Sequence, residues 1–151
     1  MKFEARQANE THSRNEYCSW EEVELLTKIV ADKIRTSKKR YDAIIGITNG
    51  GIIPARLMAR ELGINQIHFI PVRDRKLQKK EMPPLYKDRK YLIVDEIYDT
   101  GDTFSKVYDA VRTFDCDFAF LMRRFIEGDI DGAPYIGKVL NHNKWIVFPW
   151  E

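Results

Sequence analysis

The chain has 151 residues, a length that suits one compact domain. Hydrophobic residues make up 44% of it and aromatic residues 12%, which is enough to build a core and excludes a disordered protein. Lys and Arg total 25 against 23 Asp and Glu, a balance that argues against a dedicated nucleic-acid-binding protein. The two cysteines, Cys18 and Cys116, form no metal-binding spacing and are expected to be reduced thiols.

The sequence carries no sign of export or of membrane insertion. No apolar run is long enough to span a membrane, and the polar start of the chain lacks the apolar core of a signal peptide. We therefore expect a cytoplasmic protein that contacts no membrane. Residues 1–16 show no clear period and are expected to be an N-terminal extension, either flexible or an early edge strand.

Helices and strands are expected to alternate after this extension. Ser19 and Glu22 form a capping box at the start of a helix, and residues 42–47 are an Ile-rich run typical of a buried parallel strand. Further apolar stripes at helical spacing predict helices at residues 53–62 and 104–114. Short apolar runs predict strands at residues 67–72, 91–94, 118–122, 135–140 and 145–148. This alternation indicates an α/β fold with a mostly parallel sheet.

Residues 73–90 interrupt the pattern. The segment is strongly basic, contains two adjacent prolines and has few apolar residues, so it is expected to be a long surface loop. Loops of that length in a compact domain are usually functional or mobile.

The most informative segment is Leu92–Thr103, which leads from a predicted strand into a predicted helix. Its residues 100–103 (TGDT) offer hydroxyls and backbone N–H groups at a helix start, a place that favours a phosphate. The adjacent carboxylates of Asp95 and Glu96 would repel that phosphate, so they are expected to reach sugar hydroxyls or a Mg²⁺ ion instead. The segment is therefore interpreted as a binder of a sugar phosphate with a metal nearby.

This segment resembles the motif that binds 5-phosphoribosyl 1-pyrophosphate (PRPP) in the type I phosphoribosyltransferases: an apolar strand, two acidic residues, a short spacer and Thr-Gly-x-Thr. The resemblance covers residues 17–151, which are expected to form one domain with a small C-terminal hood. It implies that Asp95 and Glu96 hold the ribose and the metal. The 5′-phosphate would be held by Thr100, Gly101, Asp102 and Thr103.

Residues 48–51 (Thr48, Asn49, Gly50 and Gly51) resemble the pyrophosphate loop of the same family. Paired glycines let a backbone approach an anion closely, although Asn-Gly-Gly is also a common turn. Close family members often carry a basic residue where Asn49 stands, and its absence weakens the expected hold on pyrophosphate. Arg73, at the start of the basic loop, is expected to meet pyrophosphate when that loop closes over the site.

The C-terminal residues 144–151 (KWIVFPWE) resemble the tail of the short bacterial and archaeal purine phosphoribosyltransferases. By this resemblance Trp145 stacks on the purine and the backbone of Ile146 reads its edge, although an edge strand packed on the core would give the same pattern. Arg123 is the best match for the family's lysine that contacts the 6-oxo group, and Arg124 is its neighbour. Arg is a planar fork and Lys a point charge, so the replacement bears on the choice of base.

The resemblance implies transfer of the phosphoribosyl group from PRPP to a 6-oxopurine, with Mg²⁺ as cofactor and pyrophosphate as the second product, in purine salvage. Hypoxanthine and guanine rank first, with xanthine as a further candidate. Asp99 matches the family's aspartate that meets the purine N7 and would act as general base. A homo-oligomer, dimer or tetramer, is implied as well.

Two other functions stay open. A regulatory or binding protein that keeps the PRPP fold without activity is favoured by Asn49 and disfavoured by an intact Asp99. An enzyme of the same fold that acts on a pyrimidine or a modified base is disfavoured by the Trp145-Ile146 tail.

Overall fold

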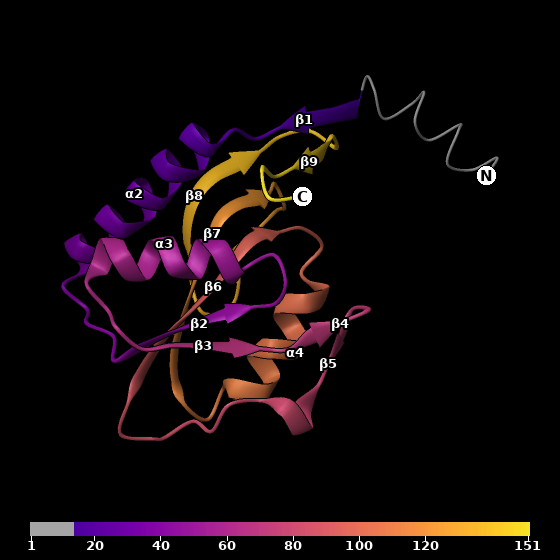
Figure 1. The fold of residues 1–151 in the computed structure, drawn as a ribbon. Coiled ribbons are helices and arrows are strands. Elements are labelled where there is room, and N and C mark those ends of the chain that lie inside the picture. Colours follow the sequence, from indigo (N-terminus) through magenta and orange to yellow (C-terminus); the bar gives the residue numbers. More distant parts are fainter. Residues whose placement is uncertain (1–13) are drawn as a thin grey trace.

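The computed structural model describes residues 14–151, and the expected extension at residues 1–16 lies mostly outside this range. Its centre is a five-stranded parallel sheet in the order β3-β2-β6-β7-β8 (Figure 1). The strands of this sheet are β2 (Ala43–Ile47), β3 (Ile67–Ile70), β6 (Lys90–Tyr98), β7 (Asp115–Arg124) and β8 (Tyr135–Leu140). The chain is therefore the single-domain α/β fold with a mostly parallel sheet that the sequence predicts.

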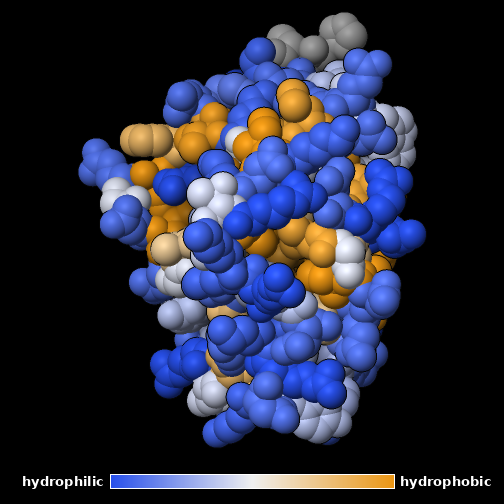
Figure 2. Space-filling model, turned by 90° about the vertical axis from the view of Figure 1, so that its left-hand side faces the viewer, coloured by the Kyte–Doolittle hydropathy of each residue, from blue (hydrophilic) through white to orange (hydrophobic). Residues whose placement is uncertain are grey.

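Helices cover both faces of the sheet (Figure 1). On one face, α2 (Trp20–Ser37) packs on α3 (Ile52–Leu62) and on β7 and β8, while α4 (Asp102–Val111) lies on the other face. The capping-box prediction is confirmed in its Ser19 half, because the Ser19 hydroxyl accepts the Glu22 N–H at 3.1 Å, whereas the Glu22 carboxylate pairs with Lys138 at 2.9 Å. Seen from the side on which α2 and α3 lie, the surface is largely hydrophilic with hydrophobic patches between the polar side chains (Figure 2).

The core has one apolar layer on each face of the sheet. Ile45, Ile93 and Phe118 face α4 with its Phe104 and Val107. On the other face, buried residues of β2 and β6 pack against α2 and α3, including Ile44, Leu92, Val30 and Met58. Both faces of the central strands are thus covered, which accounts for their continuous apolar runs.

Two small sheets are separate from the central one. Near the start of the described chain β1 (Asn15–Tyr17) pairs in parallel with β9 (Trp145–Val147), so the two ends of the domain lie side by side (Figure 1). The pair β4 (Val72–Arg73) and β5 (Lys76–Leu77) forms a short hairpin, followed by the 3₁₀ helix η1 (Lys79–Glu81). The segment 73–90, predicted to be a loop throughout, therefore begins with regular structure.

The strand β6 is longer than the predicted strand at 91–94. It continues through Asp95 and Glu96 to Tyr98, so the acidic pair lies in the sheet and not between the strand predicted at 91–94 and the helix predicted from residue 104. β6 continues this far because β7 pairs with it along one side: Asp95 is in register with Phe120 of β7, and Tyr98 is in register with Arg123. A long neighbour can hold polar residues in a strand that their own propensities do not favour.

Candidate active site

The loops that end β2 and β6 lie at the same edge of the parallel sheet, which is the edge where open α/β folds bind ligands. After β6, a cavity of about 160 Å³ is lined by residues 95–104 and by Phe120. Its lining includes residues 95–103 of the segment that the sequence marks as the PRPP-binding motif. Its wall therefore comes from one continuous stretch of chain and one side chain of the neighbouring strand.

The phosphate cradle is the turn before α4. Gly101 has a positive φ of 87°, and a Cβ there would meet the side chain of Tyr98, so glycine suits the position. The N–H of Asp102 donates to the Thr100 hydroxyl at 3.3 Å, whereas the other first-turn N–H groups of a helix lack intrahelical partners. The cradle thus offers backbone donors at the positive end of the α4 dipole.

The carboxylate of Asp102 is engaged by a neighbouring lysine and does not face a ligand in the cradle. Its carboxylate pairs with Lys106 at 3.1 Å, and the same ammonium donates to the carbonyl of Arg75 in the β4–β5 hairpin at 2.7 Å. Among the cradle residues named from the sequence, Asp102 can therefore contribute its backbone more readily than its carboxylate. Its side chain, through Lys106, instead connects the cradle helix to the hairpin.

The acidic pair carries strongly perturbed carboxyl groups. Burial, and then repulsion from Glu96, raise the pKa of Asp95 well above its ordinary value, although the Glu96 N–H donates to its carboxylate at 2.8 Å. Burial and the nearby Glu151 raise the pKa of Glu96 to about 7, and a hydrogen bond from Trp150 partly opposes this. Both groups are costly to ionise in the unliganded protein, so a cation or hydroxyl donors supplied by a ligand would stabilise their charged forms.

The second loop reaches this acidic pair because it is built from glycine. A Cβ on Gly50 would overlap the Glu96 carboxyl group, and a Cβ on Gly51 would lie 2.5 Å from the Val94 carbonyl oxygen. The two glycines therefore let residues 48–51 pack directly on β6. The Thr48–Asn49 peptide bond is cis, and Asn49 is exposed.

The hydroxyl of Thr48 forms two hydrogen bonds within the protein. The hydroxyl donates to the Ile70 carbonyl at 3.3 Å and accepts the Val72 N–H at 3.3 Å. These bonds tie the loop to the start of the β4–β5 hairpin. The side chain of Thr48 thus positions the loop, and the Asn49 carbonyl accepts the Ile52 N–H at 3.1 Å.

A smaller cavity of about 60 Å³ adjoins the acidic pair on the side of the C-terminal strand. Its lining combines residues that are far apart in the chain: Glu96, Ile97, Asp99, Arg124, Trp145, Ile146, Phe148 and Glu151. Trp145 is 59% exposed, so a face of its ring is open to a flat ligand, whereas Ile146 is buried. The parallel pairing of β9 with β1 holds this strand in place.

Arg124, and not Arg123, lies in this cavity. The Nε of Arg124 donates to Asp99 at 3.1 Å and its Nη1 to the His142 carbonyl at 3.0 Å. The guanidinium of Arg123 instead donates to carbonyl oxygens of its own strand end, Arg124 and Ile126, both at 3.3 Å. Arg124 was the second of two adjacent candidates in the sequence, and no pattern in the sequence selected it over Arg123.

Asp99 does not cap the helix that follows. The cap residue of α4 is Gly101, and the side chain that bonds the first turn is that of Thr100. Asp99 is held instead by Arg124, with its own side chain 48% exposed. It thus presents a carboxylate between the cradle cavity and the Trp145 cavity, since it lines both.

Arg73 lies apart from both cavities in this structure. It is exposed at the end of β4 and forms a two-point ion pair with Glu81 of η1.

The sequence analysis did not identify three residues near the C-terminus that help to form the site: Phe148, Trp150 and Glu151. The Trp150 ring stacks on the Phe148 ring with 5.0 Å between the ring centroids. Trp150 and Glu151 both shift the pKa of Glu96. No periodic pattern marks these last residues, so only their place beside Trp145 could have pointed to them.

No group of three or more His, Cys, Asp or Glu side chains converges as a metal cage within residues 14–151. The oxygen ligands of Asp95 and Glu96 still suit Mg²⁺, which commonly takes one or two carboxylates and completes its shell with water and substrate phosphates.

Within residues 14–151, no helix is both long and apolar enough to cross a membrane.

Comparison with known proteins agrees with this geometry. Residues 19–151 match the family model described as a phosphoribosyl transferase domain. The chain is 28% identical to a xanthine-guanine phosphoribosyltransferase of Cereibacter sphaeroides, over 93% of this chain and 89% of the relative. A similar relative from Desulfotalea psychrophila is also 28% identical, over 95% and 90% of the two chains.

A solved structure is similar as well. The purine phosphoribosyltransferase from Pyrococcus horikoshii superimposes with a TM-score of 0.70 at 31% identity, covering 91% of this chain and 94% of that one. Family model, relatives and fold thus agree with the PRPP motif at the end of β6. The chain belongs to the type I phosphoribosyltransferases, among which it resembles the short purine enzymes.

Proposed function

We propose that the protein transfers the 5-phosphoribosyl group of PRPP to a 6-oxopurine base, giving a nucleoside monophosphate and pyrophosphate in purine salvage. The observation that carries this proposal is Asp99, which lines both the phosphate-cradle cavity and the cavity beside Trp145. A base against Trp145 and a ribose above the acidic pair would meet at this carboxylate. The names of the curated relatives, xanthine-guanine phosphoribosyltransferases, support a purine.

Each part of PRPP has a matching group. The 5′-phosphate sits on the backbone donors of residues 100–103, and the ribose hydroxyls face Asp95 and Glu96. The pyrophosphate lies along the Asn49-Gly50-Gly51 backbone, which packs against Glu96. Asp95 and Glu96 would also hold Mg²⁺, which would supply charge stabilisation for the leaving pyrophosphate. The paired carboxyl groups with raised pKa values fit such a cation.

The base is held between Trp145 and the Asp99–Arg124 pair. The Trp145 ring stacks on the purine, and the backbone of Ile146 meets its edge. Within residues 14–151 the Nη2 atom of Arg124 has no acceptor, while Nε and Nη1 are engaged. We therefore assign the donor to the 6-oxo group to Arg124 in place of Arg123, whose guanidinium is bonded to its own strand end.

The chemical step places the base nitrogen in line with C1 of the ribose and the departing pyrophosphate. A transition state of this kind resembles an oxocarbenium ion, so positioning and stabilisation of the leaving charge carry the catalysis. Asp99 accepts the proton from N7 as the bond to C1 forms, and Arg124 orients the carboxylate for this. Arg73 and the hairpin close over the pyrophosphate and exclude water.

A base-panel assay with PRPP and Mg²⁺ tests the proposal. Hypoxanthine and guanine should turn over fastest, with xanthine behind, and chelation of Mg²⁺ should abolish measurable PRPP binding by calorimetry. Turnover of adenine or uracil above every 6-oxopurine would refute the base assignment. PRPP binding without any turnover would favour the regulatory alternative, for which exposed Asn49 in the pyrophosphate loop is the specific observation. We also expect a homo-oligomer located in the cytoplasm.

A further inference from the structure

A second cavity lies at the opposite end of the fold from the PRPP motif. Its volume is about 600 Å³, within the range of about 300–1,000 Å³ that is typical of small-molecule sites. It is formed where α2 ends, where the chain enters β2 and where α3 ends. Its lining residues are Ile34, Arg35, Lys38, Lys39, Arg40, Tyr41, Leu62, Gly63 and Ile64.

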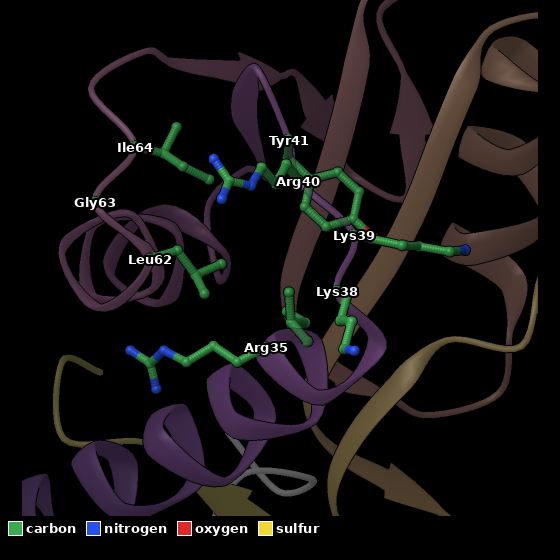
Figure 3. A pocket seen from close by; sticks show the side chains of 9 residues that line it. Arg35, Lys38, Lys39, Arg40, Tyr41, Leu62, Gly63 and Ile64 are labelled. Carbon is green, nitrogen blue, oxygen red and sulfur yellow. The ribbon is translucent and has the colours of Figure 1, made fainter.

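The cavity combines cations with an apolar wall (Figure 3). Arg35 reaches in from α2 and Arg40 from the chain before β2, and Leu62 lies between them, whereas Lys39 points away. Arg35 is fixed in place by Asp32 at 2.7 Å and by the Glu61 carbonyl at 2.6 Å. The wall is therefore ordered before any ligand arrives.

The positive charge is only partly compensated. Arg35 pairs with Asp32 and Glu61, and Lys39 pairs with Asp117 at 3.3 Å. Among residues 14–151, no carboxylate lies within ion-pairing distance of Lys38 or Arg40. The cavity thus has two cations available to a ligand, which suits a phosphate monoester of charge about −1.5 to −2 at pH 7.

The apolar side of the cavity favours a ligand with a flat ring. Tyr41 is held by hydrogen bonds of its hydroxyl to Asp117 and Tyr135, so its ring keeps one orientation. Leu62 and Ile64 provide aliphatic contact from the end of α3. An inorganic ion would leave this surface uncovered, whereas a purine or pyrimidine ring would pack against it.

We propose that this cavity is a second binding site, for a nucleoside monophosphate, with Arg40 contacting the phosphate, Lys38 adding positive charge from the end of α2, and Tyr41, Leu62 and Ile64 contacting the base. The site is separate from the cavities at the other end of the sheet and shares no residue with them. It accordingly does not depend on the reaction proposed above. The site recognises two parts of its ligand at once, the dianionic phosphate and the ring of the base.

Calorimetry with GMP tests the proposal by stoichiometry. The double variant Lys38→Gln/Arg40→Gln should bind one GMP fewer per chain than the wild type, whatever binds at the other end of the sheet. The control Lys28→Gln/Arg112→Gln removes the same charges at exposed positions outside the cavity and should bind as many as the wild type. Equal stoichiometry in the wild type and the first variant, or an equal fall in both variants, would overturn the site.

Two further measurements complete the test. Arg40→Gln alone should weaken this binding event at least tenfold, and it avoids the left-handed backbone of Lys38 (φ 61°), where a new side chain could disturb folding. Guanosine and inorganic phosphate should each bind the site at least tenfold more weakly than GMP. Inorganic phosphate binding as tightly as GMP would exclude the nucleoside part of the ligand.

Discussion

Replacing Asp99 by Asn separates a catalytic from a structural role for this residue. In the wild type, the Arg124 Nε atom lies 3.1 Å from the Asp99 carboxylate and donates to it. The side-chain oxygen of Asn can accept the same hydrogen bond, but Asn cannot accept the N7 proton of the purine. The half-exposed Asp99 side chain limits the stability that its ion pair contributes to about 1 kcal/mol or less. For a chain of this length, that corresponds to a fall in melting temperature of about 2–4 °C at most.

The effect on the rate should be much larger. Loss of a general base typically lowers kcat by about 10²- to 10⁴-fold, which corresponds to about 2.7–5.4 kcal/mol of activation free energy. PRPP affinity should change far less, because the backbone of residues 100–103 and the acidic pair hold the phosphate and the ribose.

The assay measures kcat with hypoxanthine, PRPP affinity by calorimetry and the melting temperature on one preparation. Asp109→Asn, an exposed Asp of α4 away from both cavities, is the matched control and should keep its rate. A near-normal kcat in folded Asp99→Asn protein would refute the base role. An equal loss of kcat and of PRPP affinity would instead assign Asp99 to substrate binding.

Three further predictions follow from the same site. Gly50→Ala should abolish PRPP binding in a folded protein, since a Cβ there overlaps the Glu96 carboxyl group, and unchanged affinity in calorimetry would contradict that packing. Because the pKa of Glu96 rises from 4.5 to about 7 on folding, its protonated form stabilises the metal-free protein below pH 4.5, and this contribution, at most about 3 kcal/mol, is lost as the pH rises to 7. Urea unfolding at several pH values should show this slope in the wild type and a smaller one in Glu96→Gln, where the buried Asp95, whose pKa is also raised, still contributes in the same direction. Residues 74–86 should exchange amide hydrogens rapidly without ligand and more slowly with PRPP and Mg²⁺, as expected of a loop that closes over the site; equal exchange in both states would argue against closure.

The order of elements was predictable because each depends on neighbouring residues. The bond from the Glu22 N–H to the Ser19 hydroxyl and the end of α3 at Gly63, with φ 68°, are local events that the sequence specifies by itself. The Ile-rich strand at residues 43–47 needed only its composition and length. The extension of β6 through Asp95 was missed because a pairing partner far along the chain, Phe120 of β7, holds it in the sheet.

The amino-acid sequence by itself determined the PRPP motif, since the cradle and the acidic pair lie within one short segment whose spacing is visible without a fold. Tertiary structure decided which side chains meet there. Strand register and twist bring Arg124 to Asp99, and the bare backbone of Gly50 lets the second loop press on Glu96. Trp145 joins them through the pairing of β9 with β1 and the packing of the neighbouring Ile146 in the core. Contacts of this kind link residues distant in the chain and depend on how strands pair and twist, which no local pattern encodes.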